Sequence, residues 1–328
     1  MEFRLSEDQV ALREGIRSFC NDRVPNEQFV EIEKGGGFDR ALWNEVAEMG
    51  VFALRLPEDQ GGVALGMADA VIVFAELGRR VVPGPLVWTH LAAGLVDGAE
   101  TGRRVVGGIE LAPGATGPIL VEYLDFLDDL LVVRPDGVER VDPKRVVGSP
   151  VATPLDPLTP VHEVSELPRG EAVGDAALAE RLRREGAVLA SGLLLGIAEA
   201  TLELANDYAK SREQFGRTIG SFQAIKHILA DMFVRQEVAR AAAYAAGAIV
   251  DHPDAGDLHA AVSGAKINCG EAAMKNARAC VQVHGGMGYT WEVPAHYYLK
   301  RTWVLENAFG TVDEHAEALA DRVAARVA

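Results

Sequence analysis

The sequence contains little cysteine. Its 328 residues include only three, Cys20, Cys269 and Cys280, and these lie far apart along the chain. An odd number of cysteines at such separations matches neither a disulfide framework nor a zinc site. The histidines show no metal-ligand spacing either. We therefore expect reduced thiols, no bound metal and a cytoplasmic location.

Positive charge is also scarce, since 32 lysines and arginines face 48 aspartates and glutamates, a net charge of −16. A nucleic-acid backbone is held by a surplus of basic side chains, so this class of partner is excluded. No apolar run looks long enough to span a bilayer, and MEFRLSEDQV at the N-terminus lacks the apolar core of a signal peptide. We expect no membrane association.

The chain is long enough for two or three packed domains, and the pattern of its apolar and turn residues changes twice along the sequence. Residues 1–100 have helical patterning, with Ser6 as an N-cap and Gly50 ending a later helix. Residues 101–176 contain short β-branched runs, and Asp136-Gly137 indicates a hairpin. Residues 177–328 return to a helical period. The prediction is a mainly α protein with an N-terminal helical domain, a small middle β domain and a C-terminal four-helix bundle.

The last region predicts four long helices in sequence, the third over 256–284 and the fourth over 294–327. Near the start of the second, one apolar stripe is predicted to comprise Phe222, Ile225, Leu229, Met232 and Phe233.

A first candidate binding motif, YAKSREQFGRTIGSFQAIKHILADM, joins the first two bundle helices at residues 208–232. Arg212 offers a planar, permanently charged fork for phosphate oxygens, and Gln214 and Gln223 add amide groups. A purely structural interpretation is equally open, in which Phe215 fills the core and Gly216 turns the chain.

A second candidate motif, QVHGGMGYTWEVP, lies between the third and fourth helices at residues 282–294. Adjacent glycines allow a ligand to approach backbone N–H groups closely. No predicted strand precedes this loop, so it is not a Rossmann fingerprint. By itself the pattern is common in turns.

Together the two motifs resemble the acyl-CoA dehydrogenase family. The resemblance covers residues 1–90 and 180–300, including LSEDQVALREGIRSF and LPEDQGGVALGMADA near the N-terminus. It implies a subunit with helical, β and helical domains, in which FAD lies where subunits meet. The resemblance implies contacts to the pyrophosphate and adenosine part of a neighbouring subunit's FAD from Arg212, Gln214, Phe215, Gln223, Gln282, Gly285 and Gly286.

The sequence departs from the family where the catalytic base is expected. The family's glutamate precedes a Gly-Thr pair, but here Phe309 precedes Gly310-Thr311 and cannot accept a proton. The alternative position, on the first bundle helix, holds Gly186. Nearby Glu306 and Glu185 are interpreted as solvated carboxylates on helix surfaces. The family's flavin-ring stretches, Thr-Glu-Pro-x-Ala-Gly-Ser-Asp and Lys-x-Trp-Ile-Thr, are missing between residues 107 and 174.

With these departures, the sequence resembles the smaller, non-catalytic chain of actinobacterial α2β2 acyl-CoA dehydrogenases. Those enzymes act on CoA thioesters of steroid side chains. The resemblance implies a larger partner chain that supplies the base and binds most of the acyl-CoA substrate. One alternative is a self-sufficient homo-oligomeric dehydrogenase that uses Glu306 or Glu185 as a relocated base. A flavin monooxygenase of the same fold is a further alternative, but it would also need the flavin-ring site that is missing here. A non-catalytic structural homologue is another, but it would not need Arg212 or both glycines.

Overall fold

The computed structural model describes residues 4–112 and 117–327, so the outermost ends of the predicted first and third domains lie outside the described residues. The chain forms two compact units. The helical unit contains residues 1–30, 67–82 and 187–328, and the mixed unit contains residues 31–66 and 83–186. The units interleave along the sequence and cut across the three predicted domains, so that division stays a prediction. The mainly α fold with a small β portion is confirmed.

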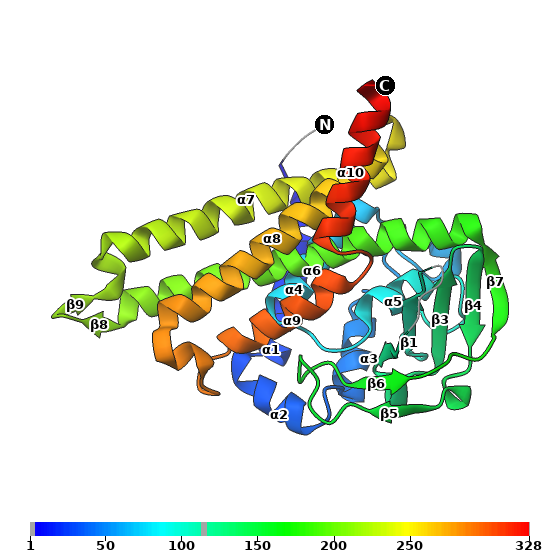
Figure 1. The fold of residues 1–328 in the computed structure, drawn as a ribbon, viewed down its shortest axis with the longest axis horizontal. Coiled ribbons are helices and arrows are strands. Elements are labelled where there is room, and N and C mark those ends of the chain that lie inside the picture. Colours follow the sequence, from blue (N-terminus) through cyan, green and yellow to red (C-terminus); the bar gives the residue numbers. More distant parts are fainter. Residues whose placement is uncertain (1–3, 113–116, 328) are drawn as a thin grey trace. The chain divides into compact units, whose positions relative to one another are not determined.

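Long helices make up the helical unit (Figure 1). Its helices are α1 (Glu7–Arg23), α4 (Met67–Arg79), the larger part of α6 (Ala176–Ser211), α7 (Gln223–Asp251), α8 (Leu258–His284), α9 (Ala295–Asn307) and α10 (Val312–Val327). Ser6 begins α1 as predicted, because its side chain accepts a hydrogen bond from the Gln9 amide in a complete capping box. A short hairpin, β8 (Glu213–Gln214) and β9 (Arg217–Thr218), joins α6 to α7.

Buried Asn276 on α8 links three of these helices. Its side-chain amide donates to the carbonyl of Ala198 on α6 at 3.3 Å and to that of Met232 on α7 at 3.0 Å. Its amide oxygen accepts from Arg235 at 3.3 Å. A buried amide with all these groups bonded favours one axial register, because any shift of a helix would leave polar atoms unpaired.

The α4–α6 crossing depends on glycine. A Cβ atom on Gly196 would lie 1.9 Å from the Ala75 carbonyl oxygen, and one on Gly78 would lie 2.1 Å from that of Leu193. The two backbones therefore approach more closely than any larger side chain would permit.

The mixed unit contains the remaining helices and both main sheets. Its elements are the end of α2 (Phe29–Lys34), α3 (Arg40–Glu48), α5 (Leu86–Ala92), β1 (Val106–Glu110), β2 (Ile119–Glu122), β3 (Asp129–Arg134), β4 (Gly137–Val141), β5 (Gly148–Pro150), β6 (Val161–Val164), β7 (Glu171–Asp175) and the first residues of α6. Gly50 follows α3 with φ +78°, as its predicted role at the helix end requires.

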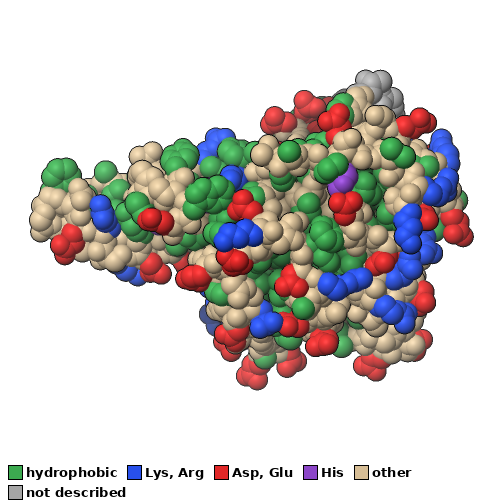
Figure 2. Space-filling model, turned by 90° about the horizontal axis from the view of Figure 1, so that it is seen from below, with side chains coloured by type: hydrophobic (Ala, Val, Ile, Leu, Met, Phe, Trp, Pro, Cys, Tyr) green, Lys and Arg blue, Asp and Glu red, His purple; other side chains and the backbone are tan. Residues whose placement is uncertain are grey.

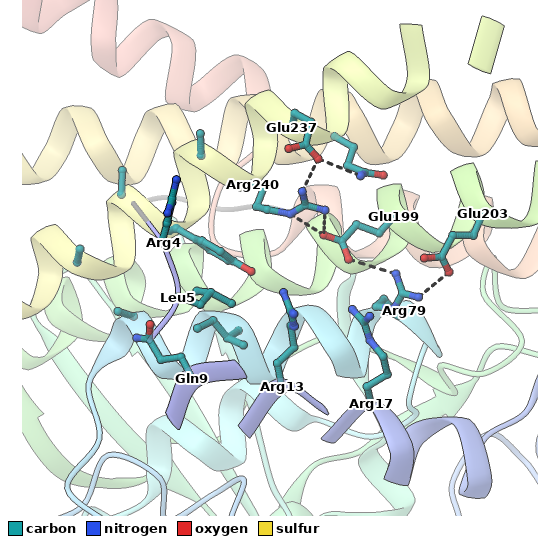
Figure 3. A pocket seen from close by; sticks show the side chains of 17 residues that line it. Arg4, Leu5, Gln9, Arg13, Arg17, Arg79, Glu199, Glu203, Glu237 and Arg240 are labelled. Carbon is teal, nitrogen blue, oxygen red and sulfur yellow. Dashed lines mark hydrogen bonds and ion pairs between the residues drawn. The ribbon is translucent and has the colours of Figure 1, made fainter. Parts of the chain in front are cut away.

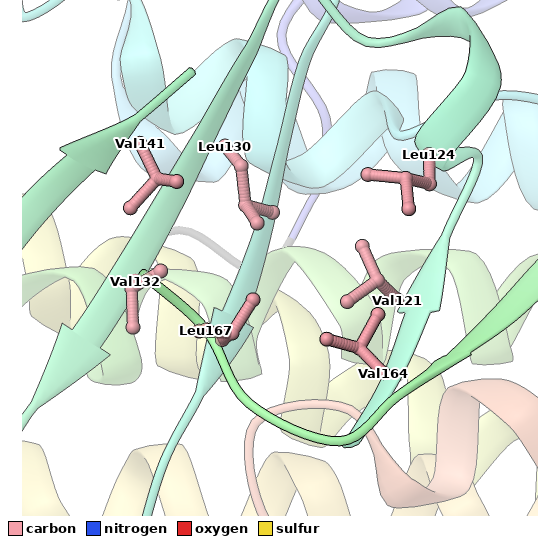
Figure 4. Close-up of a cluster of buried hydrophobic side chains, with 7 residues drawn as sticks. All are labelled: Val121, Leu124, Leu130, Val132, Val141, Val164 and Leu167. Carbon is pink, nitrogen blue, oxygen red and sulfur yellow. The ribbon is translucent and has the colours of Figure 1, made fainter. Parts of the chain in front are cut away.

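The strands form two sheets, in the orders β1-β3-β4-β7 and β2-β6-β5. Strands β1 and β3 are parallel, and the other pairs are antiparallel. The predicted hairpin is confirmed, but Arg134 pairs with Gly137, so Pro135-Asp136 forms the turn instead of Asp136-Gly137. Both sheets contribute to one apolar cluster (Figure 4), which comprises Val121, Leu124, Leu130, Val132, Val141, Val164 and Leu167.

Three sequence expectations are wrong. The predicted helix over 294–327 is two helices, because Phe309 and Gly310 adopt φ of +56° and +89° and break the helix between α9 and α10. Phe233 is not on the buried stripe but is 53% exposed. Finally, α6 is apolar enough over an 18-residue window to meet the length and composition of a membrane span, although 83% of that window is buried within the protein.

We expect Gly196→Ala to lower the free energy of unfolding by about 2 kcal/mol or more, because the new methyl group must push α4 and α6 apart. Gly264→Ala on α8 is the matched control, since a Cβ there meets no atom within 4 Å and should stabilise the helix by up to about 1 kcal/mol. Urea unfolding followed by circular dichroism measures both. Equal effects of the two substitutions would contradict this account of the crossing.

Candidate functional site

The first predicted motif forms the hairpin at the end of α6. The Arg212 amide donates to the Tyr208 carbonyl, and the Arg212 carbonyl accepts from the Ile219 amide, both at 2.8 Å. Between the strands, Phe215 and Gly216 adopt φ of +54° and +75°. Two successive positive φ angles are typical of a two-residue hairpin turn whose twist matches the strands. Gly216 therefore turns the chain as predicted, and the strain of a left-handed residue falls on Phe215.

The side chains of this motif point away from the core. Phe215 is 91% exposed, so the interpretation of this ring as a core plug is wrong. Arg212, Gln214 and Gln223 are exposed as well. Within the described residues, the Arg212 guanidinium has no hydrogen-bond or ion-pair partner, and the Gln214 amide donates only to the neighbouring Glu213 carbonyl. The hairpin thus presents a guanidinium fork and an aromatic ring to the outside of the chain.

Arg217 is a further basic residue of this hairpin surface, and the sequence did not predict it. Its guanidinium lies 4.0 Å from the centroid of the Phe222 ring, which in turn makes an edge contact with Phe215 at 6.1 Å. Cation–π contact of this kind fixes the direction of an otherwise mobile side chain. The repeated basic residue in Arg212-x4-Arg217, one on each side of the turn, is the signal that could have identified it.

The second predicted motif ends α8 and forms a 3-10 turn, η7 (Gly285–Tyr289). The three glycines of this turn differ in the structural constraint that acts on each position. Gly285 adopts φ +61° and ψ −138°, a conformation open to glycine alone, and Gly288 packs so that a Cβ would lie 2.7 Å from the Val281 carbonyl oxygen. Gly286 is exposed, and a Cβ there would meet no atom within 4 Å. Packing within the described chain therefore does not require glycine at position 286. A ligand that approached this backbone closely would require it.

An aromatic stack joins the two motifs. The rings of Tyr208, four residues before Arg212, and His284, the residue before Gly285, stack with centroids 4.2 Å apart. The His284 Nδ1 lies 2.8 Å from the Cys280 carbonyl, and burial lowers the pKa of this imidazole. His284 is therefore a structural residue held neutral inside the helical unit, and not a group presented to a ligand.

The structure therefore brings the predicted binding residues to one end of the helical unit. Figure 1 shows the β8–β9 hairpin and the end of α8 on the same side. All seven predicted residues are exposed there: Arg212, Gln214, Phe215, Gln223, Gln282, Gly285 and Gly286. Figure 2 shows apolar side chains along the narrow end that contains this hairpin. Exposed aromatic residues there include Phe233 at 53% and Tyr289 at 79%.

The position of the expected base is occupied by a buried aromatic ring. Phe309 is 6% exposed, and its carbonyl lies 2.9 Å from the His315 Nε2. The fully buried Lys266 donates to the carbonyls of Glu306 and Gly310, which secures the turn around Phe309. The Glu306 carboxylate accepts from the Val312 amide at the start of α10. Glu306 is thus a half-buried helix cap, and its interpretation as a solvated surface carboxylate is wrong.

The same interpretation is wrong for Glu185 in the mixed unit. This carboxylate is 8% exposed and forms an ion pair with Arg55 at 2.8 Å. The pair borders a small cavity of about 110 Å³ that His90 also lines, and burial lowers the His90 pKa to about 4. Gly186 is buried next to it in the sequence. Glu185 therefore has a cationic partner that holds its carboxylate in one orientation.

Comparisons with known proteins agree with this architecture. Residues 6–99 match the N-terminal domain model of acyl-CoA dehydrogenases, and residues 176–324 match the C-terminal domain model. The chain is 34% identical over 303 residues to the acyl-CoA dehydrogenase IpdE2 of Mycobacterium tuberculosis, covering 90% of this chain and 91% of IpdE2. It is also 34% identical to FadE34 of the same organism, of which it spans 45%.

A solved structure extends the likeness to three dimensions. One chain of the ChsE4–ChsE5 complex from Mycobacterium tuberculosis superimposes with a TM-score of 0.86 at 24% identity, over 99% of both chains. Residues 100–175, which contain the two main sheets, lie between the two matched family models. On these matches, the chain belongs to the acyl-CoA dehydrogenase family.

Proposed function

We propose that this chain is a supporting subunit of a cytoplasmic, FAD-dependent acyl-CoA dehydrogenase. It contributes FAD-binding residues in trans to a larger catalytic chain, in an α2β2 assembly that oxidises an acyl-CoA thioester between the α and β carbons. The observation that carries the proposal is the outward-facing fork of Arg212, which has no partner among the described residues, at the same end of the helical unit as the exposed Gly286. A guanidinium and a glycine that leaves room for close approach both suit a pyrophosphate.

The donor set fits the adenosine diphosphate part of FAD better than it fits the flavin ring. Arg212 and the open approach to the backbone at Gly286 suit phosphate oxygens, and the exposed ring of Phe215 suits contact with an aromatic base. A ligand held by residues on the outside of one chain must complete its contacts on another chain. FAD supplies the redox chemistry when bound, and the role of this chain is to hold and orient it.

The absence of a usable base on this chain supports the same division of labour. Phe309 has no proton acceptor, while Glu306 and Glu185 are held by a helix N-terminus and by Arg55. A general base needs a free carboxylate within hydrogen-bond reach of the substrate proton. In the proposed assembly the larger chain supplies that carboxylate and most of the acyl-CoA pocket.

The relatives support a steroid side-chain CoA thioester as the substrate class. The ChsE4–ChsE5 structure is a complex of two proteins, and another matched structure, Tcur3481–Tcur3483, is described as a steroid acyl-CoA dehydrogenase. FadE34 is more than twice as long as the region that this chain matches, so more than half of that relative lies outside the match. These three relatives support the proposal that this chain acts together with a second acyl-CoA dehydrogenase chain.

A self-sufficient homo-oligomer is the second candidate function. One observation favours it, because Glu185 is a buried carboxylate beside a cavity, an environment in which a base can be tuned. Its ion pair with Arg55 and the small volume of that cavity favour a structural role.

We expect Arg212→Ala to weaken FAD retention by the assembled complex about tenfold or more, because a charged hydrogen-bond donor to phosphate is lost. The isolated chain should unfold at the same temperature as wild type, since the Arg212 guanidinium has no hydrogen-bond or ion-pair partner within the described residues and its backbone bonds are kept in the variant. Flavin absorbance after gel filtration measures the first effect. Arg103→Ala, on an exposed side chain of the mixed unit, is the control. Full flavin occupancy in Arg212→Ala would remove the basis for binding in trans.

Glu185→Gln separates the two candidate functions. We expect it to lower the free energy of unfolding by about 1–3 kcal/mol, because Arg55 loses its ionic partner, while turnover by the assembled complex stays at the wild-type value. Thermal unfolding and dye-reduction assays give the two readouts. Loss of turnover with unchanged stability would instead identify Glu185 as the base and favour the homo-oligomer.

A further inference from the structure

A second cavity lies in the helical unit, among α1, α4, α6 and α7 (Figure 3). Its volume of about 580 Å³ is within the range of small-molecule sites. None of the seven predicted FAD-binding residues lines it. The cavity is therefore separate from the site described above.

The cavity wall contains five arginines and three glutamates, in a chain that is acidic as a whole. Each glutamate is already bonded to an arginine. Glu199 accepts from Arg79 at 3.2 Å and from Arg240 at 2.8 Å, while Glu203 is paired with Arg79 and Glu237 with Arg240. Each of the three carboxylates is thus paired with an arginine of the same wall.

Arg13 differs from its neighbour Arg17 because its guanidinium has no carboxylate partner among the described residues. Arg17, one turn further along α1, forms a bidentate pair with Glu76, with distances of 2.7 and 2.9 Å. Figure 3 shows Arg13 pointing beside it from α1 toward Glu199 and Arg240. The Arg13 Nε is buried and has no hydrogen-bond partner among the described residues. A buried donor nitrogen of this kind is unfavourable unless a ligand atom accepts a hydrogen bond from it.

The rest of the wall defines what kind of anion fits. Apolar groups of Leu5, Ile72 and Ala245 line the cavity beside the charged groups. A carboxylate matches the planar fork of Arg13, and an attached hydrocarbon would cover the apolar wall.

We propose that this cavity is a binding site for a small organic monocarboxylate with an apolar body, whose carboxylate pairs with Arg13. The bound molecule would contact α1, α4, α6 and α7 together. Nothing in this proposal depends on flavin binding or on a partner chain.

Hexanoate titrated into the purified full-length chain, followed by isothermal calorimetry, tests the proposal. We expect saturable one-site binding of hexanoate, no saturable binding of 1-hexanol, and weaker binding of inorganic phosphate. Arg13→Gln should raise the Kd for hexanoate about tenfold, because the charged hydrogen bonds are lost. Arg278→Gln, on an exposed side chain of α8, is the control and should bind as wild type does.

Ala245→Leu provides a second variant that changes volume without changing charge, and it should also weaken hexanoate binding by filling part of the cavity. Circular dichroism confirms that each variant is folded. Failure of hexanoate to bind the wild-type chain, or unchanged affinity in both Arg13→Gln and Ala245→Leu, would overturn the proposal. Binding of phosphate as tight as that of hexanoate would overturn the assignment to a carboxylate.

Discussion

The side-chain amide of Asn276 joins α6, α7 and α8, and the candidate FAD site depends on the register that it favours. The site is made of two loops that start where these helices end, so their relative position follows from how the helices are aligned. A buried amide bonded to two other helices penalises any slip, since each lost bond leaves a polar atom without water. The stack of Tyr208 on His284 then joins the ends themselves. Glycines at the α4–α6 crossing add close backbone packing within the same unit.

On this rigid support the binding groups face outward. Arg212, Phe215 and Gly286 take little part in the packing of the described chain, and exposure of the Phe215 ring costs the free energy that its burial would contribute. That cost is explained if another chain and its cofactor cover them. The turn at Phe309 shows the opposite arrangement: Lys266, Glu306 and His315 bond it from several sides. One family scaffold thus keeps an open candidate binding end and fills the position of the expected base with structural contacts.

The sequence predicted the helical architecture well, for identifiable reasons. Ser6 and Gly50 mark helix ends through local chemistry, and the motif around Arg212 is specific enough to place a loop between helices. The predictions of side-chain burial were wrong where a residue far away in the sequence determines whether the side chain is buried. The burial of Glu185 depends on Arg55, which is 130 residues away in the chain, and periodicity gives no sign of it. Phe233 fits an apolar stripe but lies on the exposed face of α7, because a pattern of apolar residues does not say which chain will cover them.

The most direct test of the central claim is the flavin content of this chain purified alone, compared with the same chain co-purified with a larger acyl-CoA dehydrogenase chain. The account predicts a colourless isolated protein and a yellow complex with about one FAD for each pair of unlike chains, because the exposed residues around Arg212 hold only one part of the cofactor. Stoichiometric FAD on the isolated chain would contradict it, and would mean that this chain holds the flavin ring as well.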